Sequence, residues 1–267
     1  TKLCLYTQIF ETKKPFFSHN CNGNADDYIE NVQDIPHPFS LQIPFSREKK
    51  EYDDISFNLV LIGEANKFFP IFLEVFRQIK NYSFKRFGIK FENIKATQTF
   101  PDKGKPFVIY YYNDYVNDPI IQEPLDEKDE GTDKVQINLL SPLYLRKDKK
   151  MLKEIISFDI IFQSIVRRIN IINRFYGKDQ TERLIIEPEI MKKISEISII
   201  KNETYFYSQE RFSKRQDKRI SMSGIIGQIV ICGEILKDLS NVFQYSEKLS
   251  IGKNVYFGSG MLRFNYI

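Results

Sequence analysis

Three glycines and a lysine close together near the end of the chain have the composition of a phosphate-binding loop. Glycine lacks a Cβ atom, so it adopts positive φ angles and lets backbone N–H groups come close to a ligand, while lysine adds a positive charge. No Gly-Lys-Ser/Thr sequence leads into a helix here, which excludes a Walker motif, and the strand that follows excludes a dinucleotide-binding fingerprint. A tight turn that closes a sheet is the alternative interpretation. The loop residues with a predicted binding role are Gly252, Lys253, Gly258 and Gly260.

A second basic segment lies upstream, between residues 211 and 219. Its sequence, RFSKRQDKR, holds five cations, one acid and a phenylalanine. Two basic segments in one domain, one rich in glycine and one with an aromatic residue, favour the phosphate backbone of a nucleic acid over a mononucleotide. A solvated hairpin is the alternative. The cations predicted to bind nucleic acid are Arg211, Lys214, Arg215, Lys218 and Arg219.

Histidine is the natural group for general acid–base chemistry near neutral pH, and the chain has only two. His37 lies between two prolines in a segment that should be extended and at a sheet edge, and His19 begins a polar loop. A histidine in either setting is more often a plain surface or turn residue. The catalytic group therefore stays unassigned, with His37 and His19 as candidates. The acidic pairs and runs fall in loop-like sequence without metal-ligand spacing, so no metal site is predicted.

The elements that must position these residues are clearest in the second half of the chain. Apolar positions at three- and four-residue spacing predict helices, and β-branched or apolar runs between turn signals predict strands. Together they give the order βαββαβ with one short extra helix. The predicted elements are the strand 135–140, the helices 157–175 and 188–195, the strands 197–207 and 225–232, the helix 234–245 and a final strand from Met261.

The first half predicts part of the same pattern. The order strand, long loop, strand, helix, strand fits a βαββαβ unit that lacks its first strand and first helix. The sequence also begins with Thr1 rather than methionine, so we expect an N-terminal piece upstream. A polar, acidic stretch divides the halves. The predicted strands are 3–10, 55–62, 84–94 and 107–115, and the predicted helix is 68–79. The predicted domains are 1–116 and 134–267, joined by a linker at 117–133.

Composition bounds the remaining possibilities. The chain has 267 residues, of which 42% are hydrophobic, enough for a packed core, and its net charge of +4 leaves nucleic acid open as a partner. The three cysteines are widely spaced, which predicts a reduced, cytoplasmic protein without a disulfide framework or zinc pair. No apolar run reaches the length of a membrane span. No cofactor is predicted.

The ordered motifs resemble the C-terminal domain of the sixth CRISPR-associated (Cas) protein family, the repeat-RNA endoribonucleases of the RAMP superfamily. The motifs are Leu140–Arg146, Arg174–Gly177, Arg211–Gln216, Met222–Gly227 and the glycine loop, and the resemblance covers about 134–267 best. It implies an α+β fold of two tandem ferredoxin-like, RRM-like βαββαβ domains, the first lacking its first strand and helix.

The resemblance also implies a function. Such a protein binds CRISPR repeat RNA and cleaves precursor crRNA without a metal, through attack of a 2′-hydroxyl that leaves 2′,3′-cyclic phosphate and 5′-hydroxyl ends. The family usually places its catalytic histidine near the first helix, a region that this chain does not match, so the full-length protein is the expected enzyme. The alternative is a non-catalytic RAMP subunit that binds crRNA among other Cas effector subunits.

Overall fold

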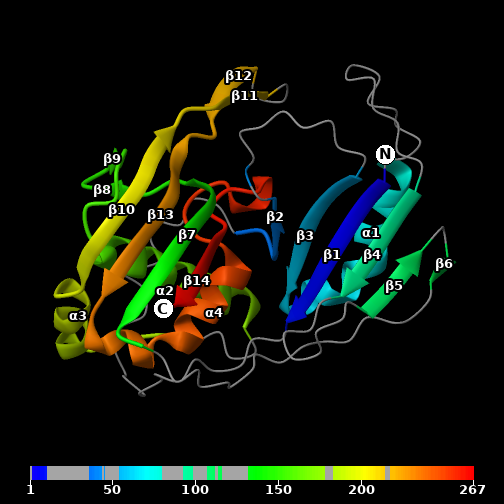
Figure 1. Ribbon diagram of the computed structural model, residues 1–267. Coiled ribbons are helices and arrows are strands. Elements are labelled where there is room, and N and C mark those ends of the chain that lie inside the picture. The colour runs from blue at the N-terminus through cyan, green and yellow to red at the C-terminus, as the bar shows by residue number, and fades with distance from the viewer. Residues whose placement is uncertain are drawn as a thin grey trace.

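The computed structural model describes residues 2–10, 36–43, 45, 54–79, 93–98, 107–111, 114–115, 132–177, 183–213 and 217–267. Within these ranges the chain forms a six-stranded sheet in its first half, a four-stranded sheet in its second half and two short hairpins (Figure 1). Helices and strands are mixed in both halves, so the fold is α+β, as predicted. The predicted linker 117–133 lies almost wholly outside the described residues.

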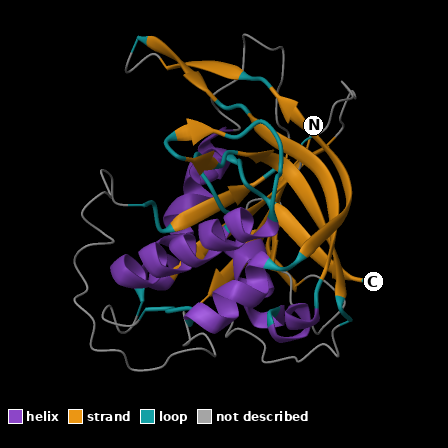
Figure 2. Cartoon of the chain, turned by 90° about the vertical axis from the view of Figure 1, so that its left-hand side faces the viewer, coloured by secondary structure: helices purple, strands orange, loops and turns teal. Residues whose placement is uncertain are grey.

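The C-terminal sheet has the strand order β10-β13-β7-β14, and every neighbouring pair is antiparallel. Helix α2 follows β7 and helix α4 precedes β14, so the sheet strands and these helices follow the predicted order βαββαβ. Figure 2 shows the helices gathered beside the strands. The elements are β7 (Lys134–Leu143), β8 (Arg146–Lys147), β9 (Lys150–Met151), α2 (Phe158–Tyr176), α3 (Pro188–Ser195), β10 (Ser198–Tyr207), β11 (Glu210–Ser213), β12 (Lys218–Ser221), β13 (Gly224–Cys232), η3 (Glu234–Asp238), α4 (Ser240–Leu249), η4 (Val255–Phe257) and β14 (Leu262–Tyr266).

Helix α2 supplies much of the core of this half. Its predicted apolar stripe is buried, which confirms that the 3.6-residue spacing marks the face turned to the sheet. The helix predicted at 234–245 differs in the structure: a 3₁₀ turn, η3, comes first and α4 then runs from Ser240 to Leu249. The buried stripe of α2 consists of Ile160, Ile161, Ile165, Ile169 and Ile172.

The N-terminal sheet has the order β2-β3-β1-β4-β5-β6, with β1 parallel to both β3 and β4. The C-terminal sheet is antiparallel throughout, so the two halves do not share one strand topology. The sequence analysis expected a missing strand and helix before the strand 3–10; in the structure this strand, β1, lies between β3 and β4. Parallel neighbours require crossover connections, and α1 lies in the crossover between β3 and β4. The elements are β1 (Lys2–Phe10), β2 (Phe39–Gln42), β3 (Asp54–Ile62), η1 (Gly63–Phe68), α1 (Phe69–Ile79), β4 (Asn93–Gln98), β5 (Phe107–Tyr111) and β6 (Asp114–Tyr115).

Strand β3 connects the cores of the two halves. Phe57, Leu59 and Leu61 pack with α1, whereas Val60 and Ile62, on the opposite face, join the core of the C-terminal half. A strand buried on both faces reads as a continuous apolar run rather than an alternating one, which explains the sequence of 55–62. Most of the predicted strand 84–94 lies outside the described residues.

Candidate nucleic-acid interface

The glycine loop, residues 250–261, connects α4 to β14. Its backbone leaves the ordinary φ range at five positions: Ser250, Gly252, Asn254, Gly258 and Gly260. Non-glycine residues adopt positive φ uncommonly, and asparagine does so more easily than most. The short 3₁₀ turn η4 sits between Asn254 and Gly258, both in the left-handed region. The loop is therefore a tightly specified turn as well as a candidate binding element.

Packing explains two of the three glycines, Gly252 and Gly260, and a positive φ favours glycine at all three positions. A Cβ atom at Gly252 would lie 2.6 Å from the Tyr144 carbonyl oxygen, and one at Gly260 would overlap the Ile251 carbonyl oxygen. A Cβ at Gly258 would instead meet the Ile43 side chain at 3.4 Å. A side chain at 258 would thus press on the segment after β2. The alternative interpretation, a turn that closes the sheet, accounts for the glycine pattern by itself.

The loop nevertheless leaves some N–H groups available. The N–H of Gly258 donates to the Val255 carbonyl, and that of Gly260 donates to the Pro142 carbonyl. No hydrogen bond joins the N–H of Gly252 or Lys253 to another described residue. The backbone donors that can meet a phosphate are therefore at the start of the loop, next to the lysine, and not at its two later glycines.

Lys253 lies in a cluster of cations around one tyrosine. Its Nζ is 5.7 Å from the centroid of the Tyr144 ring, and the Arg146 guanidinium carbon is 5.3 Å from the same centroid. The Nε of Arg146 also donates to the Tyr144 hydroxyl at 2.8 Å. In the part of the chain that the structure describes, neither cation pairs with a carboxylate. Both charges are exposed and available to an anion.

The predicted basic segment meets the other side of the loop. Arg211 stacks on Phe257 of η4, with its guanidinium carbon 3.7 Å from the ring centroid, a short cation–π contact. Its buried Nε has no hydrogen-bond partner among the described residues, so contacts within the protein do not use every donor of this guanidinium. The structure thus brings Arg211 of the basic segment into contact with the glycine loop.

The other predicted cations divide into two groups. Lys218 and Arg219 lie on β12, which pairs with β11 to form a hairpin. Arg219 contacts Glu210 at 3.5 Å, and both side chains are exposed, so this pair adds little stability. Lys214 and Arg215 lie outside the described residues.

His37 lies beside the glycine loop although it is far away in sequence. Its ring is exposed, and its centroid is 4.6 Å from that of Tyr256, edge to face. Hydrogen bonds hold the residues before and after His37. The Tyr176 hydroxyl of α2 donates to the Pro36 carbonyl, and the Ile62 N–H donates to the Pro38 carbonyl at 3.0 Å. His37 is therefore a fixed group on the edge of the predicted RNA surface. His19 lies outside the described residues.

Strand β2 holds this arrangement in place through a buried polar latch. The Gln42 amide nitrogen donates to the carbonyls of Glu247 at 2.6 Å and Lys248 at 3.1 Å, at the end of α4. The Ser40 hydroxyl donates to the Ser250 hydroxyl at 3.3 Å. Gln42 is 3% exposed and Ser40 is fully buried. The latch satisfies carbonyls that a helix end leaves without partners and joins β2 to the first residue of the loop.

Two charged groups near the latch have shifted pKa values. Burial raises the pKa of Glu247 above its ordinary value, although the Phe264 N–H, which donates to its Oε1 at 2.6 Å, opposes the shift. Burial lowers the pKa of Lys248 to about 8, and the charge of Glu247 opposes this shift. The neighbouring charges do not cancel the cost of desolvation at either group.

Two other classes of site were tested against the geometry. In the described ranges no group of three or more His, Cys, Asp or Glu side chains has the arrangement of a metal site. Across the same ranges, no helix combines the length and apolarity needed to cross a bilayer.

Sequence reasoning missed the aromatic part of the surface. Tyr144, Tyr256 and Phe257 each contact a predicted functional residue, yet as single aromatic residues they carry no sequence signal. The latch was also missed, because its partners are more than 200 residues apart. The one signal available was the glycine loop itself, which contains Tyr256 and Phe257.

Comparisons with known proteins agree with the resemblance. Residues 137–262 match the family model of the CRISPR-associated endoribonuclease Cas6, and residues 1–120 match a model described as an N-terminal domain. The sequence matches none of the curated proteins. A product complex of Thermus thermophilus Cas6 resembles the structure with a TM-score of 0.50 at 9% identity, covering 87% of this chain and 84% of that one, and it supports the fold alone.

Two further similar structures score lower. A second Cas6 product complex has a TM-score of 0.44 at 12% identity, with 89% of this chain and 88% of that chain covered. A Cas6-RT-Cas1–Cas2 complex has a TM-score of 0.48 at 9% identity, with 91% of this chain and 25% of that chain covered.

Proposed function

Through residues 137–262 this chain belongs to the CRISPR-associated endoribonuclease Cas6 family, and we propose that it binds CRISPR repeat RNA and cuts precursor crRNA at the surface around the glycine loop. The observation that carries the proposal is the meeting of three distant segments. His37 contacts Tyr256 of the glycine loop, and Arg211 contacts the next loop residue, Phe257. Lys253, in the same loop, lies beside Tyr144. A histidine can transfer protons, unpaired cations can bind phosphates and aromatic rings can stack on bases, and an RNA-cleaving enzyme uses all three functions.

The RNA backbone would lie along the cations of this surface. Lys253 and Arg146 flank Tyr144 on one side of the loop, and Arg211 stacks on Phe257 on the other. The N–H groups of Gly252 and Lys253 add donors for one phosphate. Lys218 and Arg219 extend the positive charge along the hairpin. Bases would stack on the accessible parts of the partly exposed Tyr144 and Tyr256 rings.

The proposed reaction needs no metal. A 2′-oxygen attacks the adjacent phosphorus, the bond from phosphorus to the 5′-oxygen breaks, and the products carry a 2′,3′-cyclic phosphate and a 5′-hydroxyl. One proton leaves the 2′-hydroxyl and one reaches the departing 5′-oxygen. His37 is the candidate for one of these transfers, because imidazole is the commonest acid–base group in enzymes and the His37 ring lies beside the loop, against Tyr256. Arg211 and Lys253 would stabilise the charge that develops on the phosphate.

Cleavage of repeat RNA tests this proposal directly. The substrate is the repeat from a CRISPR array of the same genome, incubated with the protein in EDTA. We expect one cut and a 3′ product end that resists phosphatase until acid opens the cyclic phosphate. His37→Ala should lower the cleavage rate by about 10²- to 10⁴-fold, the usual contribution of general acid–base catalysis. Lys192→Ala, an exposed cation on α3, is the matched control and should cut like the parent. Cleavage unaffected by His37→Ala would remove the histidine from the mechanism.

A binding-only role is the second candidate. A RAMP subunit that holds crRNA in an effector complex would use the same cations, and the case for it is that packing and positive φ angles account for the three glycines without any catalytic role. Tight binding of repeat RNA without any cleavage in EDTA would favour it. In either role we propose other Cas proteins as partners and a cytoplasmic location, where CRISPR transcripts are made.

A further inference from the structure

The hairpin β11–β12 projects from the C-terminal half as an arm. Figures 1 and 2 both show it beyond the ends of β10 and β13, away from the helices. A two-stranded hairpin that projects alone is marginally stable in water. Its orientation must therefore come from contacts at its base.

The two faces of the arm differ in chemistry. Cross-strand partners share a face, and the register pairs Arg211 with Ile220 and Phe212 with Arg219. Arg211 turns toward the glycine loop, where it stacks on Phe257. Phe212 therefore lies on the opposite face, with Arg219 across from it, and 59% of its surface is exposed. An apolar ring beside an exposed guanidinium faces solvent on the side of the arm away from the loop.

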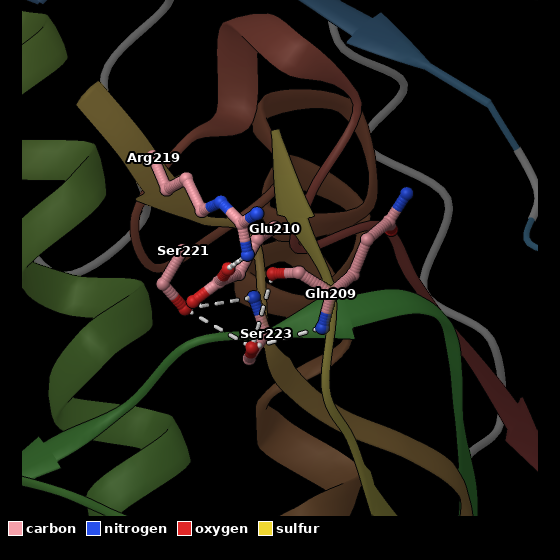
Figure 3. Close-up of polar contacts among 5 residues, drawn as sticks. All are labelled: Gln209, Glu210, Arg219, Ser221 and Ser223. Atoms are coloured by element: carbon pink, nitrogen blue, oxygen red, sulfur yellow. Dashed lines mark hydrogen bonds and ion pairs between the residues drawn. The ribbon is translucent and has the colours of Figure 1, made fainter. Parts of the chain in front are cut away.

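Hydrogen bonds at the base fix the direction in which this ring points. The buried hydroxyl of Ser223 accepts from the Gln209 N–H at 3.0 Å and donates to the Gln209 carbonyl at 3.2 Å. The Ser221 hydroxyl contacts the Ser223 hydroxyl at 3.0 Å, and Figure 3 shows these residues joining the two strands. The Asn254 amide of the glycine loop donates to the Ser221 carbonyl at 3.2 Å. The arm is thus anchored to the loop at two points, by Asn254 and by Arg211.

We infer that Phe212 is a base-stacking residue: on the side of the arm away from the glycine loop, it presents its ring to an unpaired base, or to the last base pair of a stem, in the part of the RNA that continues from the loop past the arm. The inference rests on the proposed function and adds a specificity element to it. Stacking suits any base, because each has an aromatic face, and the stacked base gains contact without a hydrogen bond. Arg219, held to Glu210 by a weak exposed pair, can exchange that partner for the phosphate next to the stacked base.

Charge distinguishes an RNA partner from a protein partner at this ring. Single exposed apolar residues are common on protein surfaces and need no partner. Phe212, however, lies in a segment with five cations and one acid, and its cross-strand neighbour is a cation. An apolar docking site for a protein is normally depleted of charge at its centre. The composition around Phe212 is that of a stacking platform within a phosphate-binding surface.

The test measures affinity for the repeat RNA of the same genome at several salt concentrations. Phe212→Ala should weaken binding by about 5- to 30-fold, the lower range for one stacked base. The dependence of log affinity on log salt should keep its slope, because a lost stack releases no counterion. Phe212→Trp should bind like the parent. Arg219→Gln should instead make the slope shallower by about 0.7. Ile200→Ala, on β10 with 55% exposure, is the matched control.

A fluorescence measurement identifies the base. We expect 2-aminopurine, placed singly along the RNA, to be quenched on binding at one position by the parent and not by Phe212→Ala. If Phe212→Ala binds and quenches like the parent while Lys253→Ala binds weakly, the proposed function stands and the stacking inference is wrong. If the parent does not bind repeat RNA, both are wrong. Since Phe212 is exposed, thermal unfolding of Phe212→Ala should match the parent and exclude misfolding as the cause.

Discussion

The latch between β2 and α4 gives the most direct test of how the two halves are held together. Gln42→Ala removes an amide that is 3% exposed and donates to the carbonyls of Glu247 and Lys248. It also removes the acceptor of the 3.4 Å hydrogen bond from the Asn58 amide. Water would not replace these contacts, because the Gln42 side chain is buried together with Ser40.

The expected size of the effect follows from these contacts. Each of the two bonds to a carbonyl contributes on the order of 1 kcal/mol net, and a desolvated carbonyl left without a donor costs about 1–3 kcal/mol. We therefore expect Gln42→Ala to lower the free energy of unfolding by about 2–3 kcal/mol. Gln42→Glu should cost more at neutral pH, because a carboxylate would face two carbonyl oxygens in a buried site.

Urea unfolding followed by circular dichroism measures the change. With a slope of about 2 kcal/mol per molar, the midpoint should fall by about 1 M while the slope stays constant. Gln228→Ala is the matched control, because the amide of Gln228 donates to an exposed glutamate on the sheet surface, and its midpoint should barely move. Equal midpoints for Gln42→Ala and Gln228→Ala would show that the latch does not contribute to stability, and the fixed position of His37 would then need another cause.

Three further predictions test the loop and its surroundings. Gly260→Ala should destabilise the protein by several kcal/mol, because its Cβ would overlap the Ile251 carbonyl oxygen and its backbone is left-handed. Gly258→Ala should cost only about 1 kcal/mol, because its Cβ would meet the Ile43 side chain at 3.4 Å. The unfolding midpoint of Gly260→Ala should therefore lie below that of Gly258→Ala. Lys253→Ala should make the salt dependence of RNA affinity shallower by about 0.7 without changing stability, and an unchanged slope would exclude a phosphate contact. The pKa of Lys248 falls from 10.5 to about 8 on folding, so the unfolded chain binds more protons between these values and stability should rise with pH by about 3 kcal/mol across that window; the rise should be absent in Lys248→Met.

Local patterns predicted the elements of the C-terminal half well. The buried stripe of α2 and the strands around Ile137 and Ile229 follow from periodicity and composition, because both depend on which face is turned to the core. The N-terminal sheet was predicted less well. The position of β1 between β3 and β4 is set by pairing between distant segments, and strand order has no signature within one strand.

In the candidate site too, local sequence patterns predicted some residues, and contacts between distant segments set the rest. Lys253, Arg211 and the glycines could be found from composition, since charge clusters and glycine spacing are local. The functional context of His37 could not, because its neighbour Tyr256 is brought to it by β2 and the latch. The glycines were also a less specific signal than expected: Gly252 and Gly260 are required by contacts with carbonyl oxygens of the chain itself.

These contacts suggest why catalysis and binding would be linked in this fold. The residue that could carry a proton belongs to the N-terminal half, and most of the cations belong to the C-terminal half. Between them lies β2, whose Ser40 contacts Ser250 at the start of the loop, while Ile43 covers Gly258 near its end. RNA that occupies the loop would therefore meet a histidine already in place, and general acid–base catalysis gains most when its groups are positioned before the substrate arrives.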